Sequence, residues 1–199
     1  MKRKHLVQLF KLAIIISIVF KAVQLIDRIY NIVIIELVVR GNEKYRNKLH
    51  FIFREIKIET TIIYINSILF IILLSIWFYL KYKQAHKQTT LKLSFKPIWA
   101  LFSFIIPLFN FVAPYRIMND LWTVLNRDMS IESWGRKQIK VWWFLSIGIF
   151  LFYRYLLIRF NQVPDLEGYL SLEYYSLALY AVSIHYYLLL LKLVKFLGD

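Results

Sequence analysis

The stretch KPIWALFSFIIPLFNFVAPYRIMNDLW, residues 96–122, joins an apolar run to an amphipathic helix and is interrupted by Pro107, Asn110 and Pro114. Each proline removes a backbone N–H donor, and its ring clashes with the preceding helical turn. In hydrocarbon, a broken helix is tolerated only where protein or water pairs the freed carbonyl groups. We therefore expect residues 97–114 to form a re-entrant or interfacial segment, with a fifth membrane span as the alternative.

The composition is that of an integral membrane protein. Of 199 residues, 59% are hydrophobic and 18% are aromatic, and the mean hydropathy is +0.53. A soluble domain of this size would need a larger polar shell. The sequence contains no internal repeat or low-complexity tract, so we expect one all-α membrane domain over residues 1–199. The lack of cysteine excludes disulfides and thiol catalysis.

Four apolar stretches are long enough to cross a bilayer as helices, which takes about 20 residues. They lie approximately at residues 10–32, 61–80, 141–160 and 174–192. Residues 44–58 and 115–129 instead place apolar side chains at helical spacing among charged ones, which predicts two amphipathic surface helices. We expect the first span to remain uncleaved, because residues 20–22 (Phe-Lys-Ala) are too bulky and charged for a signal-peptide site.

Charged residues indicate the orientation of the spans. The net charge is +14, and the basic residues flank apolar spans, which is not the pattern of a nucleic-acid-binding module. Residues 161–173 contain no base and carry Asp165, Glu167 and Glu173. The positive-inside rule then predicts a multi-pass membrane protein with both termini cytoplasmic. Residues 40–59, with six bases and three acids, fit this orientation poorly.

Polar side chains also occur inside the predicted spans. One face of the first span carries six of them: Ser17, Lys21, Gln24, Asp27, Arg28 and Asn31. We expect this face to point inward, where it either joins helices or lines a polar cavity. Because unpaired charges are costly in a membrane, we predict an ion pair between Arg154 of the third span and Asp27. His185 has no second metal-ligating residue nearby in sequence, so we expect a hydrogen-bonded core histidine.

The interrupted stretch carries residues at a recognisable spacing. They are Trp99, Pro107, Asn110, Pro114, Tyr115, Arg116, Asp120 and Trp122, followed by Trp142 and Trp143. This pattern resembles that of a bacterial multi-spanning membrane family known as a domain of unknown function, DUF4328. Asp120 stands where that family usually has glutamate. The resemblance implies a four-span domain of the bacterial inner membrane and no particular activity.

The chain has no recognisable catalytic motif, because its glycines frame no nucleophile elbow and no phosphate loop, and HExxH is missing. We expect no cofactor or metal. The leading hypothesis is a non-enzymatic module whose broken segment and following helix bind lipid, another membrane protein or a second copy. Arg116 and Asp120 could then form a solvated face or fold back onto the break. The alternative is a small transporter or channel component in which Lys21, Asp27, Arg154 and Asn110 line a path.

Overall fold

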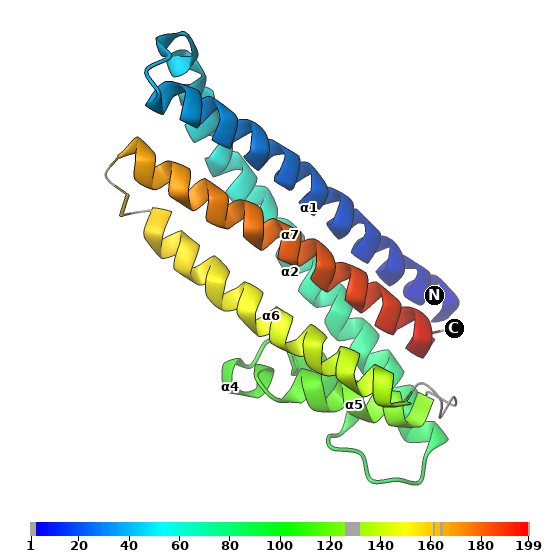
Figure 1. The fold of residues 1–199 in the computed structure, drawn as a ribbon. Coiled ribbons are helices and arrows are strands. Elements are labelled where there is room, and N and C mark those ends of the chain that lie inside the picture. Colours follow the sequence, from blue (N-terminus) through cyan, green and yellow to red (C-terminus); the bar gives the residue numbers. More distant parts are fainter. Residues whose placement is uncertain (1–2, 126–131, 161, 164, 199) are drawn as a thin grey trace. The chain divides into compact units, whose positions relative to one another are not determined.

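The computed structural model describes residues 3–125, 132–160, 162–163 and 165–198, and it is 89% helical with no strand among these residues (Figure 1). A short 3₁₀ helix, η1 (Glu43–Tyr45), accompanies seven α-helices. They are α1 (Arg3–Val39), α2 (Arg46–Gln88), α3 (Pro97–Phe102), α4 (Pro107–Asn110), α5 (Ala113–Leu125), α6 (Glu132–Phe160) and α7 (Leu166–Gly198). The predicted all-α class is confirmed.

Four of these helices contain stretches long and apolar enough to cross a membrane, which confirms the four-span architecture. The stretches are Val7–Val39, Thr61–Gln88, Glu132–Phe160 and Leu166–Leu197. The helices are longer than the predicted spans, most clearly in α2, where residues 46–88 contain neither glycine nor proline to stop the helix. Residues 46–58 of the predicted amphipathic helix 44–58 are helical, but they form the first part of α2 and not a helix of their own.

The end of α1 is set by Gly41. This glycine has a φ of 87°, a left-handed conformation that side chains with a Cβ rarely adopt. Its N–H donates to the Val38 carbonyl at 2.9 Å, and the Asn42 N–H donates to the Leu37 carbonyl at 2.9 Å. These two bonds form a Schellman motif, which pairs the last carbonyls of α1 and turns the chain toward α2.

The structure forms two compact units, and each of the four long helices contributes to both. Unit 1 consists of Met1–Ile16, Ile68–Ile147 and Tyr186–Asp199. Unit 2 consists of Ser17–Ser67 and Gly148–His185. Unit 1 therefore contains the broken segment with α3, α4 and α5. Unit 2 contains the polar face predicted for the first span.

Aromatic side chains form the core of unit 1. Their ring contacts make a closed circuit through α1, α2, α6 and α7, consisting of Phe10, Trp77, Phe78, Trp142, Tyr186, Tyr187 and Phe70. Trp77, Phe78 and Trp142 are fully buried. Each such aromatic pair contributes about 0.5–1.5 kcal/mol beyond the area it buries. Lys81 of α2 adds a polar contact to this unit, because its ammonium donates to the Leu197 carbonyl near the end of α7 at 3.1 Å.

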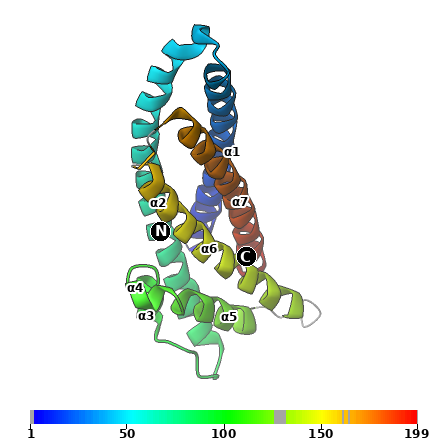
Figure 2. The same cartoon turned by 60° about the vertical axis from the view of Figure 1, so that its left-hand side comes forward.

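Helix α5 packs against this core through the apolar stripe that the sequence predicted. Ile117, Met118, Leu121 and Trp122 are all buried. The Trp122 indole lies directly on Gly135 of α6, where a Cβ atom would overlap the indole ring. Figure 2 shows α3 and α4 beside α5 in this unit. The predicted amphipathic helix thus exists as α5, although residues 126–129 of the predicted range lie outside the described residues.

Unit 2 packs the four helices through smaller apolar clusters. Ile34 and Ile35 of α1 form one cluster with Ile52 of α2 and Tyr169 of α7. Leu156, Leu172 and Leu179 form a second cluster between α6 and α7. In this unit the first half of α7 lies between α1 and α6 (Figure 1).

The contact of Trp122 with Gly135 yields a test with a matched control. Gly135→Ala should lower stability by about 1–3 kcal/mol, because the methyl group forces the indole away. Gly148→Ala in the same helix meets no atom within 4 Å, so only the gain in helix propensity, up to about 1 kcal/mol, should remain. Melting in detergent, followed by tryptophan fluorescence, should show opposite shifts. Equal melting temperatures of the two variants would contradict the packing of Trp122.

Candidate functional site

The broken segment in unit 1 keeps its backbone paired despite the interruptions. Pro97 and Pro107 are the first residues of α3 and α4, a position at which the missing N–H has no helical partner anyway. The Trp143 indole N–H donates to the Phe111 carbonyl at 3.2 Å, and the Ser103 hydroxyl donates to the Ala100 carbonyl at 2.9 Å. Trp143, one of the predicted residues, thus ties the break to α6.

Other predicted residues of the broken segment belong to its helices α4 and α5. Asn110 is the last residue of α4 and is half-buried, and Pro114 is buried in the first turn of α5. The Tyr115 carbonyl accepts a hydrogen bond from the Asn119 side chain at 2.9 Å. Of the predicted aromatic residues, Trp142 and Trp122 are core residues, as described above.

The segment leaves a large apolar surface uncovered. We call it the apolar patch; its members are Ile98, Trp99, Phe102, Ile105, Ile106, Phe111 and Val112, which are 38–61% exposed. Trp99 is the one exposed tryptophan of the six in the chain, at 42%. The Trp99 ring packs on Phe109 at 5.5 Å, and Phe95 packs on the same ring at 5.1 Å. These rings support the patch from within the segment.

Exposed basic residues adjoin the apolar patch in sequence. We call them the basic rim; they are Lys83, Lys87, Lys92, Lys96 and Arg116, all exposed. Residues 81–96 contain no acidic residue. The exposed charged residues that precede the apolar patch in sequence are therefore positive.

Asp120 connects three parts of unit 1. Its carboxylate accepts hydrogen bonds from the Tyr82 hydroxyl at 2.6 Å, the Ser94 N–H at 2.8 Å and the Ser94 hydroxyl at 3.2 Å. The Tyr82 hydroxyl also accepts a hydrogen bond from the Phe95 N–H at 3.1 Å. The idea that Arg116 and Asp120 fold back onto the break is wrong. Arg116 is exposed, and Asp120 binds α2 and the residues that precede the apolar patch.

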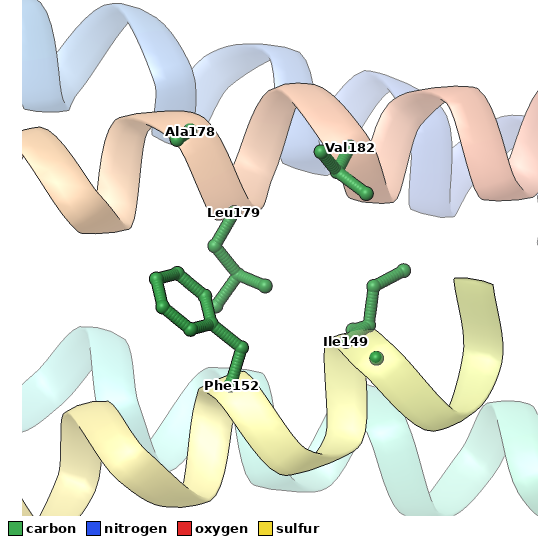
Figure 3. A pocket seen from close by; sticks show the side chains of 6 residues that line it. Ile149, Phe152, Ala178, Leu179 and Val182 are labelled. Atoms are coloured by element: carbon green, nitrogen blue, oxygen red, sulfur yellow. The ribbon is translucent and has the colours of Figure 1, made fainter. Parts of the chain in front are cut away.

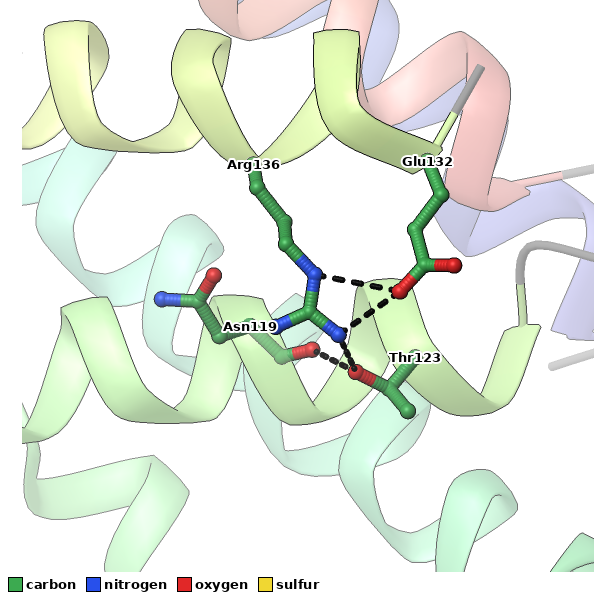
Figure 4. A network of polar contacts seen from close by, with 4 residues as sticks. All are labelled: Asn119, Thr123, Glu132 and Arg136. Atoms are coloured by element: carbon green, nitrogen blue, oxygen red, sulfur yellow. Dashed lines mark hydrogen bonds and ion pairs between the residues drawn. The ribbon is translucent and has the colours of Figure 1, made fainter. Parts of the chain in front are cut away.

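A second, exposed polar network joins α5 to α6 (Figure 4). The Arg136 guanidinium donates to the Glu132 carboxylate at 2.8 Å and to the Thr123 hydroxyl at 3.5 Å. The Thr123 hydroxyl in turn donates to the Asn119 carbonyl at 3.0 Å. An exposed pair of this kind contributes about 0–1 kcal/mol, so the buried Trp122 contact dominates the α5–α6 packing.

The polar face of α1 lies in unit 2 and points inward, as predicted. Ser17, Gln24, Arg28 and Asn31 are all buried. One nitrogen of the Arg28 guanidinium donates to both carboxylate oxygens of Glu173 on α7, at 2.8 and 3.0 Å. The two side chains are 4% and 0% exposed. This ion pair is the most deeply buried charged contact in the described part of the chain.

Lys21 lies beside the same ion pair without joining it. Its ammonium donates to the Gln24 side chain at 2.7 Å and lies 4.7 Å from the centre of the Tyr180 ring. The Arg28 guanidinium lies 5.8 Å from the centre of the same ring. Two cations therefore lie close to Tyr180, whose electron-rich ring attracts both.

The predicted pair between Arg154 and Asp27 is wrong. Asp27 is half-buried and accepts a hydrogen bond from the Asn31 amide at 3.3 Å, whereas Arg154 is exposed on α6. The buried cation is Arg28, and its partner is Glu173, which the charge pattern assigns to an outer loop. That loop is shorter than expected because Asp165 accepts a hydrogen bond from the Gly168 N–H at 2.8 Å, and α7 already begins at Leu166.

A helical signal for Glu173 was present in the sequence. Tyr169, Glu173, Ser176 and Tyr180 follow one another at steps of four, three and four residues, and all four are buried. His185 was also misplaced, since it is exposed on the outer side of α7 and not a core residue. The buried positions around it are Ser183 and Tyr186, which leaves His185 on another face of the helix.

An apolar groove of about 220 Å³ lies between α6 and α7 in unit 2 (Figure 3). Its lining residues are Gly148, Ile149, Phe152, Ala178, Leu179 and Val182. Gly148 and Ala178 are small, and they leave space that a larger apolar side chain or an acyl chain could occupy. The groove offers no polar group for chemistry.

These observations define an all-α membrane protein with four candidate spans, a buried ion pair and an exposed apolar patch bordered by lysines. The profile described as Domain of unknown function (DUF4328) matches residues 58–198, more than half of the chain. The chain belongs to this family. The matched region includes Asp120 and Glu173 but not Arg28. Comparison with curated proteins and with solved structures finds no match.

The buried ion pair can be tested against an exposed one. Arg28→Ala or Glu173→Ala should each lower stability by about 3–5 kcal/mol, because the remaining charge stays buried. The double variant Arg28→Met/Glu173→Leu should recover most of this loss. Arg46 pairs with Glu43 at 2.6 Å, but both side chains are more than 60% exposed, so Arg46→Ala should change stability by about 1 kcal/mol or less.

The measurement is denaturation in mixed micelles, followed by tryptophan fluorescence. A loss in the single variants no larger than that of Arg46→Ala would show that Arg28 and Glu173 are not buried together.

Proposed function

We propose that this chain is a non-enzymatic membrane module that binds lipid at the membrane interface through the apolar patch and the basic rim of unit 1. The observation that carries this proposal is the exposure of seven large apolar side chains in a segment outside the four candidate spans. An exposed cluster of this kind marks an interaction surface, because water contact with it is unfavourable. The bilayer that surrounds the four spans is the nearest apolar phase.

The chemistry of the surface favours lipid as the partner. Interfacial segments combine aromatic and aliphatic side chains, which enter the headgroup region, with lysines that meet anionic headgroups. The apolar patch supplies Trp99, Phe102 and Phe111, and Lys92 and Lys96 come directly before it. On the positive-inside rule this surface belongs on the cytoplasmic side of a bacterial inner membrane.

Asp120 supports this role as a positioning residue. Its hydrogen bonds hold Ser94 on α5, and the Tyr82 hydroxyl holds Phe95, so the chain enters the apolar patch from a fixed point. Such anchoring lowers the conformational entropy that the segment would lose on meeting the membrane. A residue of the family pattern thereby serves the surface without touching lipid itself.

Trp99 provides a direct test of insertion. In proteoliposomes made with acyl-brominated lipids, bromine should quench the emission of Trp99, because Trp99 alone among the tryptophans is exposed. The Trp99→Phe variant should therefore lose the quenched part of the fluorescence. The difference between wild-type and Trp99→Phe emission isolates this signal. Quenching of that difference signal by aqueous iodide, with none by brominated lipid, would refute the proposal.

Removal of two lysines tests the preference for anionic lipid. Each lysine near an anionic surface contributes about 1 kcal/mol, so Lys92→Gln/Lys96→Gln should weaken retention of anionic lipid about tenfold or more. Native mass spectrometry of protein released from mixed anionic and zwitterionic nanodiscs measures this retention. The matched control is Lys44→Gln/Arg159→Gln, which removes two exposed charges from unit 2. Equal losses in both double variants would mean that only net charge matters.

A further inference from the structure

Within its candidate spans, unit 2 has two exposed cations, Arg154 and Arg159. Asp27 is a partly exposed anion that lies farther from its helix end than Glu36 or Glu167 does. Arg154 of α6 is exposed among the exposed apolar side chains Phe150, Leu151 and Ile158. Asp27 of α1 is half-buried, and in the described part of the chain its carboxylate receives the Asn31 amide and no cation. The pair between them that the sequence suggested does not form within one chain.

The membrane makes these two charges costly to leave alone. Asp27 lies 12 residues before Val39, the last residue of its helix, and Arg154 lies six residues before Phe160. A long arginine side chain can extend along the helix toward the headgroups, whereas the short aspartate side chain has little reach. Asp27 in particular calls for a partner inside the membrane.

Both charges lie at the same level of unit 2. The bonds of Arg28 to Glu173 set residues 27–28 of α1 beside residue 173 of α7. The Phe152 ring of α6 meets the Tyr175 ring of α7 at 6.3 Å, and the two helices are joined by a short connection after Phe160. Arg154, two residues further toward that connection, is therefore level with Glu173. Copies of the chain that are inserted in the same orientation therefore have Asp27 and Arg154 at the same depth in the membrane.

We propose that unit 2 forms a contact between two copies of the chain, in which Arg154 of one copy pairs with Asp27 of the next. The two residues come from different faces, so the contact is heterologous, with unlike surfaces of the copies meeting. The pairing neutralises an anion and a cation that the single chain leaves apart. This contact is separate from the lipid-binding surface of unit 1.

The apolar groove of Figure 3 fits the same contact. Lys21 lies over the Tyr180 ring, which sets residues 21–24 of α1 level with the groove residues Ala178 and Leu179. Val23, one turn from Asp27, is 57% exposed. When Asp27 pairs with Arg154 of the neighbouring copy, Val23 lies level with the apolar groove of that copy. Small groove residues permit the close helix approach on which association in membranes depends.

Cysteine cross-linking tests the proposal without background, because the chain has no cysteine. Two differently tagged chains, Asp27→Cys and Arg154→Cys, are expressed together, and their membranes are oxidised. A disulfide-linked product carrying both tags is expected, and little product from either variant alone. The control pair is Val19→Cys with Arg154→Cys, since Val19 of α1 is more exposed than Asp27 but lies about two turns away in depth. Equal yields from the test and control pairs would overturn the contact.

Charge reversal gives a second readout, in which the double variant also reports whether each single variant still folds. Asp27→Arg or Arg154→Asp should each weaken self-association in liposomes about tenfold, measured by single-molecule photobleaching over a range of protein-to-lipid ratios. The double variant carries both reversals in every chain and should return to the wild-type value. A wild-type chain that is monomeric at every ratio, or a double variant no better than the singles, would overturn the proposal.

Discussion

The requirement that polar groups removed from water find partners within the chain governs this structure. It acts on the backbone at the broken segment, where Trp143 and Ser103 donate to carbonyls close to the interruptions. It acts on charge in unit 2, where Arg28 and Glu173 are buried together. In a membrane the free energy lost by failing this requirement exceeds what a single apolar contact contributes, so these partners decide which helix faces can turn inward.

The four-span architecture followed from the sequence because spans depend on composition summed over about 20 residues, a quantity that one misread residue barely changes. The inward face of α1 was equally predictable, since its polar residues recur at helical spacing. Glu173 was missed for a local reason. Asp165 begins α7 earlier than the apolar stretch does, and an acid that the charge pattern assigned to a loop became the most buried charge. The distribution of charges indicates on which side of the membrane a loop lies, whereas the N-cap residue sets where the helix begins.

The residues of the family pattern have unequal roles. Trp122 and Trp142 fill the core of unit 1, Trp143 pairs a backbone carbonyl, and Asp120 holds the approach to the apolar patch. Trp99 alone among the tryptophans is exposed. A spacing pattern reports that these positions act together, but only side-chain geometry separates the supporting residues from the surface that they support.

The close approach of Trp122 to Gly135 makes two distant positions of the sequence share one volume. A relative that acquires a side chain at the position of Gly135 must reduce the residue at the position of Trp122, and the reverse order of changes opens a void. A protein that is changed at only one of the two positions is less stable. The two positions should therefore covary across the family, and paired substitutions there would mark the lineages in which α5 packs on α6 in another way.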